Sequence, residues 1–183
     1  MEKDTGRNKL QDFAEAHGAE ILRFCIILTE SRERGNDLYQ DTMLTLLMKK
    51  THFGNTEKQK SYALSVAIFL WKNERKKYAV HNRIAPTGSL EALQEKGGDD
   101  VIGGMDPGPE EAALKEHERE LVRTAIFALP EKYRLPVELY YSADATLQEI
   151  AEALHLPLST VKTRLRRAKQ QLKKALEDDF DDR

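Results

Sequence analysis

Seven cations with no acid among them lie near the end of the chain, and their chemistry is the binding of an anion. They fall between Lys162 and Lys174 and give this stretch a charge of +7. Lys and Arg side chains neutralise phosphates, which favours a nucleic acid as partner. The plainer alternative is a surface helix whose charges only keep it in solution. The seven residues are Lys162, Arg164, Arg166, Arg167, Lys169, Lys173 and Lys174.

The apolar residues around this run predict two short helices joined by a tight turn. A first stripe at positions i, i+3, i+4 and i+7 occupies residues 147–154, and a second occupies residues 158–172. Pro157 lies between them and cannot continue the first helix. Ala151 is small enough to let the two helices pass closely. Two such helices, the second apolar on one side and basic on the other, are typical of a helix-turn-helix.

A helix-turn-helix places the first residues of its second helix against the base edges of a DNA major groove. Lys169, Lys173 and Lys174 lie further along and are expected to meet phosphates or solvent. The residues expected to face the bases are Ser159, Thr160, Lys162, Thr163, Arg166 and Arg167.

Length and composition bound the possibilities for the whole chain. Its 183 residues, 40% hydrophobic and 33% charged, suit one or two helical domains. No apolar run approaches the ~20 residues of a membrane span, and the start of the chain shows no secretory signal. Cys25 is the only cysteine, which favours a reducing cytoplasm, and its apolar neighbours favour a place in the core. The five histidines share no metal-ligand spacing, so no metal and no cofactor are expected.

Charge is distributed unevenly along the chain. The net charge is only −2, yet residues 72–83 carry +4, residues 91–120 carry −7 and residues 177–183 carry −4. Two basic patches separated by an acidic segment favour nucleic-acid binding more than the net charge does.

Three helices are predicted before the acidic segment, over about 8–29, 30–50 and 61–80, with residues 1–8 frayed. In the second, Tyr39, Met43, Leu46 and Leu47 share the expected core face. Another face of this helix mixes carboxylates with an apolar residue, which fits either a solvated surface or a docking face for a partner. That face holds Asp37, Gln40, Asp41 and Leu44.

The third helix predicts a second DNA-binding surface. Tyr62, Val66, Phe69, Leu70 and Asn73 follow one side of the helical period. Core packing is the expected fate of Trp71, although aromatic rings among cations also suit single-stranded DNA. The polar and basic side holds Ser65, Lys72, Arg75 and Lys76, with Tyr78 nearby.

Residues 84–109 are rich in glycine, proline and acids, which predicts a flexible tether between two helical domains. Helical periodicity returns at Glu110 and breaks at Pro130, and a further helix is expected over 131–141. Pro136 predicts a break or kink inside that helix. Thr146 and Glu149 then have the spacing of a capping box.

Two separate blocks of sequence resemble the extracytoplasmic-function (ECF) sigma factors of bacterial RNA polymerase, within the sigma-70 family. Residues 128–136 (ALPEKYRLP), 148–154 (QEIAEAL) and 159–168 (STVKTRLRRA) resemble the fourth conserved region of that family. Residues 37–42 (DLYQDT) resemble the heart of its second region, and the helix of residues 62–77 resembles the segment that follows. The resemblance spans nearly the whole chain, in the family's order.

The resemblance implies a function. It implies an all-α protein with region 2 over residues 1–83, an acidic linker over 84–109 and region 4 over 110–183. Asp37, Gln40 and Asp41 would then dock on the clamp helices of the largest polymerase subunit. The recognition helix would read the −35 promoter element, and the linker would thread towards the active-site channel. The residues that would meet the −10 element are Lys72, Asn73, Arg75 and Lys76.

The chain departs from the family pattern at a few positions. Tyr62 and Phe69 stand where the family often has Trp and Asn, and His155 stands at a turn position that is frequently glycine. Pro157 replaces a frequent serine and cannot cap the recognition helix through its side chain. These departures concern the promoter sequence more than the fold.

The prediction is therefore a transcription initiation factor, a monomer when free and held by an anti-sigma factor. A stand-alone helix-turn-helix regulator, acting as a dimer on a symmetric operator, is the alternative. The sequence shows no nucleophile–base pair and no glycine-rich phosphate loop, which disfavours an enzyme.

Overall fold

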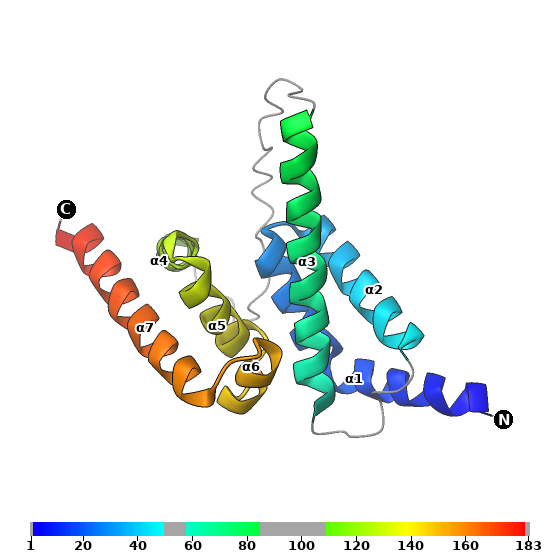
Figure 1. Cartoon of the computed structure of the whole chain (residues 1–183). Coiled ribbons are helices and arrows are strands. Elements are labelled where there is room, and N and C mark those ends of the chain that lie inside the picture. Colours follow the sequence, from blue (N-terminus) through cyan, green and yellow to red (C-terminus); the bar gives the residue numbers. More distant parts are fainter. Residues whose placement is uncertain (1, 50–57, 85–108, 182–183) are drawn as a thin grey trace.

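The computed structural model describes residues 2–49, 58–84 and 109–181, and within these ranges every regular element is a helix. The predicted all-α fold is therefore confirmed (Figure 1). The frayed start predicted for residues 1–8 is wrong, because the first helix already begins at Glu2. The helices are α1 (Glu2–Thr29), α2 (Arg32–Met48), α3 (Gln59–Ile84), α4 (Pro109–Ala128), α5 (Glu131–Ser142), α6 (Leu147–Ala153) and α7 (Leu158–Asp181).

Helices α1, α2 and α3 pack together as the N-terminal half. Ser31 caps α2, its hydroxyl accepting from the amide of Arg34 at 3.4 Å. Gly35 lets α2 approach α1 closely, because a Cβ at this position would lie 2.5 Å from the Cα of Ile26. Any larger residue at position 35 would separate the two helices.

The buried face of α2 differs from the predicted one. Leu47, expected in the core, is 43% exposed, whereas Leu38, Thr42 and Leu46 are buried. Thr42 tolerates burial because its hydroxyl donates to the carbonyl oxygen of Leu38 at 2.7 Å. A glycine and a threonine on the packing face weakened the apolar stripe there, so periodicity alone pointed to the neighbouring face.

The buried side of α3 also differs in part from the predicted one. Trp71 is 5% exposed, which confirms its predicted place in the core. Phe69, which shares a helical side with apolar residues in the sequence, is instead 62% exposed. Packing falls on the adjacent side, which carries Ala63, Leu64, Ala67 and Ile68.

Helices α4 to α7 form the C-terminal half. Helix α5 runs unbroken through Pro136, so the break expected there is wrong. The ring is fully buried, and the packing around it compensates for the hydrogen bond that proline cannot donate to Lys132. The predicted capping box is confirmed: the amide of Thr146 donates to Glu149 at 2.7 Å, and the amide of Glu149 donates to the Thr146 hydroxyl at 3.2 Å.

The two halves pack directly against each other. One hydrophobic core joins Phe24 and Leu64 of the N-terminal half to Leu139 and Ile150 of the C-terminal half. Figure 1 shows α5 and α6 beside α1 and α3. The predicted tether at 84–109 lies outside the described residues except for its ends, Ile84 and Pro109, which belong to α3 and α4. Its flexibility and the domain boundaries stay predictions.

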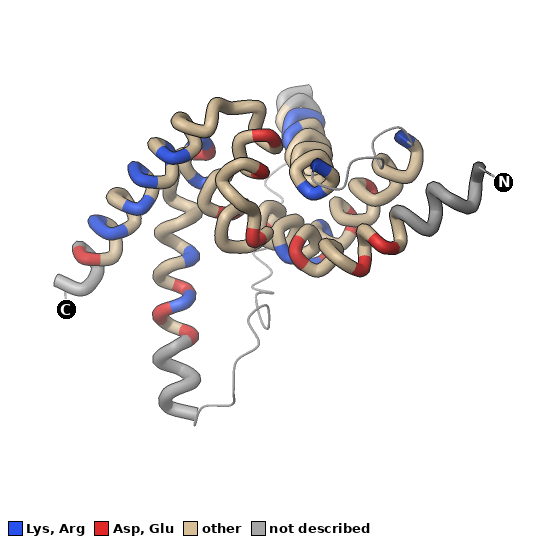
Figure 2. The backbone as a smooth tube through the Cα atoms, turned by 90° about the horizontal axis from the view of Figure 1, so that it is seen from below, with Lys and Arg blue, Asp and Glu red and all other residues tan. Residues whose placement is uncertain are grey.

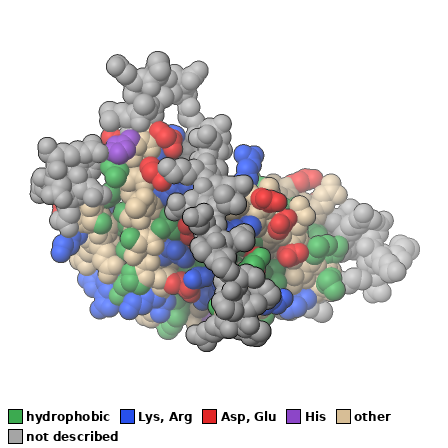
Figure 3. Space-filling model, turned by 90° about the horizontal axis from the view of Figure 1, so that it is seen from above, with side chains coloured by type: hydrophobic (Ala, Val, Ile, Leu, Met, Phe, Trp, Pro, Cys, Tyr) green, Lys and Arg blue, Asp and Glu red, His purple; other side chains and the backbone are tan. Residues whose placement is uncertain are grey.

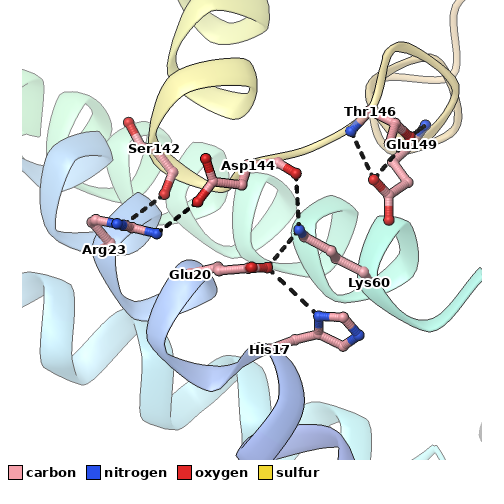
Figure 4. Close-up of polar contacts among 8 residues, drawn as sticks. All are labelled: His17, Glu20, Arg23, Lys60, Ser142, Asp144, Thr146 and Glu149. Atoms are coloured by element: carbon pink, nitrogen blue, oxygen red, sulfur yellow. Dashed lines mark hydrogen bonds and ion pairs between the residues drawn. The ribbon is translucent and has the colours of Figure 1, made fainter.

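Polar contacts reinforce this interface (Figure 4). Lys60 is 6% exposed; its ammonium group contacts the Glu20 carboxylate and donates to the carbonyl oxygen of Asp144 at 3.1 Å. Arg23 donates to the carbonyl oxygen of Ser142 and to the Asp144 carboxylate, both at 2.9 Å. Buried charges are costly without partners, so these contacts specify how the halves fit.

A further contact joins the start of α3 to α6. The hydroxyl of Ser61 donates to the Glu152 carboxylate at 2.8 Å. Helix α6 is the first helix of the predicted helix-turn-helix, so the N-terminal half touches that motif itself.

Candidate nucleic-acid interface

Helices α6 and α7 are arranged as the predicted helix-turn-helix. Val161 and Ala168 of α7 are fully buried, and Ala151 of α6 is 6% exposed, as a close helix crossing requires. Pro157 opens α7 without a side-chain cap, its carbonyl oxygen accepting from the amide of Thr160 at 2.9 Å. His155 in the turn has φ of 52°, the left-handed conformation that glycine adopts most easily.

The six residues expected to face bases lie together on the first three turns of α7. Ser159, Lys162, Arg166 and Arg167 are exposed, while Thr160 and Thr163 are half-buried. Figure 2 shows Lys and Arg recurring along α7, and Figure 3 shows basic side chains gathered along one edge of the C-terminal half.

Two of these six residues also make contacts within the chain. The hydroxyl of Thr163 donates to the carbonyl oxygen of Ser159 at 2.9 Å. A hydrogen bond from Arg167 is the main cause that lowers the pKa of Tyr133 on α5. Arg167 is therefore partly held against α5, whereas no ion pair within the described ranges neutralises Arg166.

The four residues expected to meet the −10 element lie on α3, and two of them form ion pairs with the C-terminal half. Lys72 and Arg75 pair with Glu131 of α5 at 3.0 Å and 3.4 Å. Arg75 also stacks 4.7 Å from the centre of the Trp71 ring. Lys76 is exposed and Asn73 is half-buried. A pocket of about 200 Å³ beside Trp71 and Arg75 is lined by both arginines and glutamates.

A third surface lies on α2. Asp37, Gln40 and Asp41 are exposed at i, i+3 and i+4, and so share one face. Leu44, 56% exposed, continues this face at i+7. Leu47 and Met48 extend it further, with 43% and 81% exposure. Sequence reasoning missed these last two, although the same period, carried one turn on, could have found them.

The remaining features to consider are the thiol of Cys25, groups of potential metal ligands and long apolar helices. Cys25 is fully buried, as predicted, and burial raises the pKa of its thiol to about 12. Within the described ranges, no group of His, Cys, Asp and Glu side chains could hold a metal ion. The helices of these ranges also include none with the length and hydropathy to cross a membrane.

The family model described as sigma-70, region 4 matches residues 119–172. This range includes α6, the turn and α7 as far as Leu172. Along 180 residues the chain is 24% identical to the ECF RNA polymerase sigma factor SigW of Bacillus subtilis, covering 96% of this chain and 93% of that protein. Over 77 residues it is 36% identical to the ECF RNA polymerase sigma factor RpoE of Cereibacter sphaeroides, covering 41% and 42% of the two chains.

Solved structures show the same fold. The sigma factor RpoE of Bartonella quintana, in complex with the anti-sigma factor NepR, matches with a TM-score of 0.68 and 18% identity, over 91% of this chain and 98% of that one. CnrH, in complex with the cytosolic domain of CnrY, matches with a TM-score of 0.63 and 16% identity, over 93% and 88%. The region 4 match and the likeness to SigW lead to one conclusion: the chain matches sigma-70 region 4 in its C-terminal half and is similar to ECF sigma factors along nearly its whole length.

Proposed function

We propose that the chain is a transcription initiation factor, which binds core RNA polymerase and directs it to specific promoters. In this proposal residues 1–83 bind polymerase and the −10 element, residues 110–183 bind the −35 element, and residues 84–109 connect them. The factor works in the cytoplasm and catalyses no reaction itself. The observation that carries the proposal is a helix-turn-helix with an exposed basic face, in a chain similar over 96% of its length to a sigma factor.

The −35 element is assigned to the exposed face of α7. Arg166 is the residue best placed to read a base, because its guanidinium is exposed and has no carboxylate partner among the described residues. Arginine recognises guanine through two hydrogen bonds in the major groove. Lys162 and Arg167 flank it, and Ser159, Thr160 and Thr163 complete the surface.

The −10 element is assigned to α3, and polymerase to α2. On α3, the DNA would be contacted by Lys72, Asn73, Arg75 and Lys76. Lys72 and Arg75 would first have to be released from their ion pairs with Glu131. On α2, the face that begins with Asp37, Gln40 and Asp41 combines carboxylates with the exposed Leu44, Leu47 and Met48, a composition suited to a protein partner.

An anti-sigma factor is the expected regulator. Two structural neighbours were solved with such a protein or a cytosolic domain bound. We propose a partner of this kind for the present chain, which is a monomer when free of it.

Run-off transcription tests the function. Purified bacterial core polymerase would be supplied with the full chain and a genomic promoter library, and the templates that start would be sequenced. Initiation on a small set of promoters supports the proposal and reveals both elements. If the chain does not make core polymerase start at particular promoters, and instead binds duplex DNA by itself as a dimer, it would be a stand-alone regulator.

Substitutions then separate the surfaces. Arg166→Ala should remove about 5- to 150-fold of the preference for one base pair in the −35 element, the range expected for one bidentate contact. Lys169→Ala, about three turns from the helix start, should weaken binding to all promoters alike and reduce the slope of log affinity against log salt concentration by about one. Neither should alter polymerase binding.

The polymerase surface has its own matched pair. Asp37→Asn combined with Asp41→Asn should weaken binding of core polymerase. Asp12→Asn makes the same change at an exposed carboxylate of α1 and should leave binding unchanged. Equal effects of both changes would count against a specific docking face.

A further inference from the structure

The pocket beside Trp71 lies between the two halves of the chain, and the proposed function gives it no role. The N-terminal half supplies Arg34 of α2, Glu74 of α3 and Glu30 from the turn between α1 and α2. The C-terminal half supplies Arg134 of α5. The pocket is therefore complete only while the two halves are packed together.

The size of the pocket restricts its occupant to a small molecule. A cavity of about 150 Å³ holds one benzene molecule, whereas pockets for drug-sized ligands measure about 300 Å³ or more. At about 200 Å³, this pocket admits a molecule slightly larger than benzene. Leu28, Trp71 and the ring of Tyr78 supply apolar surface for it.

Two arginines in the pocket have unused hydrogen-bond donors. Arg134 makes no side-chain hydrogen bond with the described residues; its Nε lies 3.4 Å from Oε1 of Glu138, and both atoms are buried without a hydrogen-bond partner. Arg34 donates once, to the carbonyl oxygen of Thr29 at 2.8 Å, and forms no ion pair with the described residues. Most N–H groups of both guanidiniums thus remain available to a carboxylate, which accepts such bonds strongly.

Two glutamates in the same pocket are without a cation. Glu74 is half-buried and Glu30 is exposed, and neither forms an ion pair with a Lys or Arg of the described ranges. The third arginine of the pocket, Arg75, is already paired with Glu131 at 3.4 Å. The pocket therefore presents two acceptors of negative charge beside its two arginines.

The ion pair of Arg134 with Glu138 does not remove it from this balance. Burial raises the pKa of Glu138 to about 7, so near neutral pH this carboxyl group is protonated in a large fraction of molecules. In those molecules the positive charge of Arg134 has no counterion. A ligand carboxylate in the pocket would supply one.

Both signs of charge around one small pocket complement a molecule that carries both a carboxylate and an ammonium group. A simple anion would be repelled by Glu30 and Glu74. A simple cation would be repelled by Arg34 and Arg134. A zwitterion meets neither penalty, and it can place an apolar group against the ring of Trp71.

We propose that this pocket binds a free α-amino acid with an apolar side chain. The ligand carboxylate accepts hydrogen bonds from Arg34 and Arg134. The ligand ammonium group donates to Glu30 and Glu74. The site is additional to the proposed surfaces for DNA and polymerase.

Tryptophan fluorescence tests the proposal directly, because Trp71 is the only tryptophan of the chain and lines the pocket. The full chain is titrated with leucine and then with each other apolar amino acid except tryptophan. At least one should give a saturable change, with a dissociation constant of about 1 mM or lower. Isocaproate, which is leucine without its amino group, and isopentylamine, which is leucine without its carboxyl group, should each bind about 10-fold or more weakly than leucine.

Two substitutions locate the ligand in the pocket. Arg34→Gln should weaken leucine binding about 10- to 150-fold, the range for a hydrogen bond to a charged group, and leave the binding of isopentylamine unchanged. Glu74→Gln should weaken leucine binding similarly and leave the binding of isocaproate unchanged. Arg32→Gln and Glu33→Gln are matched controls, because both residues are exposed beside Arg34 and neither lines the pocket.

Three results would overturn the proposal. No saturable change with any of these amino acids would exclude the site. Equal affinities for leucine and isocaproate would show a site for anions alone. Leucine binding that persists in both Arg34→Gln and Glu74→Gln would place the ligand elsewhere.

The ligand has a further consequence that rests on the proposed function, in which the two halves reach separate promoter elements. A ligand that needs both halves binds only the packed chain and opposes their separation. At about ten times its dissociation constant, it should raise the apparent dissociation constant for core polymerase with a selected promoter about tenfold.

The two measurements fail separately. An unchanged affinity for polymerase and promoter at saturating ligand would overturn the selective binding to the packed chain. The fluorescence titration uses the chain alone, so it decides the site even if the chain starts transcription at no promoter.

Discussion

Glu138 on α5 offers a quantitative test of the packing between the two halves. Its carboxylate is 2% exposed, lies 3.4 Å from Nε of Arg134, and accepts no hydrogen bond from the described part of the chain. Burial raises the pKa of Glu138 from 4.5 to about 7. Arg134 opposes this rise, and the negative charges of Glu30 and Glu131 add to it.

The raised pKa makes stability depend on pH in a defined direction. Below pH 4.5 the carboxyl group is protonated in both the folded and the unfolded chain, so its burial is not penalised by charge. Between about 4.5 and 7 the unfolded chain loses the proton more readily, so the free energy of unfolding falls as pH rises. The difference between the two pKa values corresponds to about 3 kcal/mol in total, at ~1.4 kcal/mol per unit.

Glu138→Gln should remove this dependence, because the amide resembles the protonated carboxyl group and cannot ionise. Urea denaturation followed by circular dichroism at pH 5 and at pH 8 would measure it for both chains. From pH 5 to pH 8, the free energy of unfolding of the variant should rise by about 2 to 3 kcal/mol relative to that of the wild type. Taking the difference between chains cancels the titration of groups unaffected by the substitution.

Two results would refute this reasoning. A stability difference that is the same at both pH values would show that Glu138 has an ordinary pKa. A variant less stable at pH 8 than the wild type would show that the ion pair with Arg134 outweighs burial.

Other substitutions test local features of the fold. His155→Gly should stabilise the chain by about 1 kcal/mol, since glycine relieves the left-handed conformation at φ 52°; thermal melting would show it, and a lower melting temperature would argue against strain at the turn. Thr146→Ala should cost about 1 kcal/mol by removing the cap of α6, measured by urea denaturation against Ser, which should retain the cap. Cys25 should react with iodoacetamide at pH 8 only after unfolding, and rapid modification of the folded chain would contradict its burial.

The C-terminal half was well predicted because its signals are local. The cations of α7 recur on the helical period with one sign of charge, and the Thr146–Glu149 cap is recognisable from four residues. Pro136 was misjudged because a helix break depends on the surroundings, and burial within a packed core holds this helix together.

The N-terminal half was harder to predict because its packing depends on distant parts of the chain. Lys60 would pass for a surface lysine, yet its partners are Glu20, 40 residues earlier, and the backbone of Asp144, 84 residues later. Phe69 fits an apolar side by spacing, while the fold buries a different side of α3. Periodicity finds the faces of a helix but does not say which distant segment covers each face.

The contact between Ser61 and Glu152 restricts how far apart the two proposed DNA-binding surfaces can be in the packed chain. From Ser61 to Lys76 is about 22 Å along α3, and from Leu158 to Arg167 about 14 Å along α7. With roughly 20 Å for the contact and the turn between them, the surfaces lie within about 60 Å of each other. The proposed −35 and −10 elements are, by the positions in their names, about 25 base pairs apart, which is about 85 Å of duplex at ~3.4 Å per base pair.

The packed chain therefore cannot span both elements, and we expect the halves to separate when the promoter is bound. The 24 residues 85–108, fully extended, would cover about 80 Å, enough for this separation. Fluorophores at positions 76 and 167 should move apart on addition of core polymerase together with a selected promoter, and a constant distance would contradict this expectation.

Separation has a thermodynamic consequence. If only the open fraction of the chain engages polymerase, the apparent dissociation constant is the intrinsic one divided by that fraction. Ser61→Ala, which touches neither DNA nor the face of α2, should then tighten polymerase binding by enlarging the open fraction. The contact between Ser61 and Glu152 would thus raise the apparent dissociation constant for polymerase. It would thereby set how much polymerase must be present before this factor binds it.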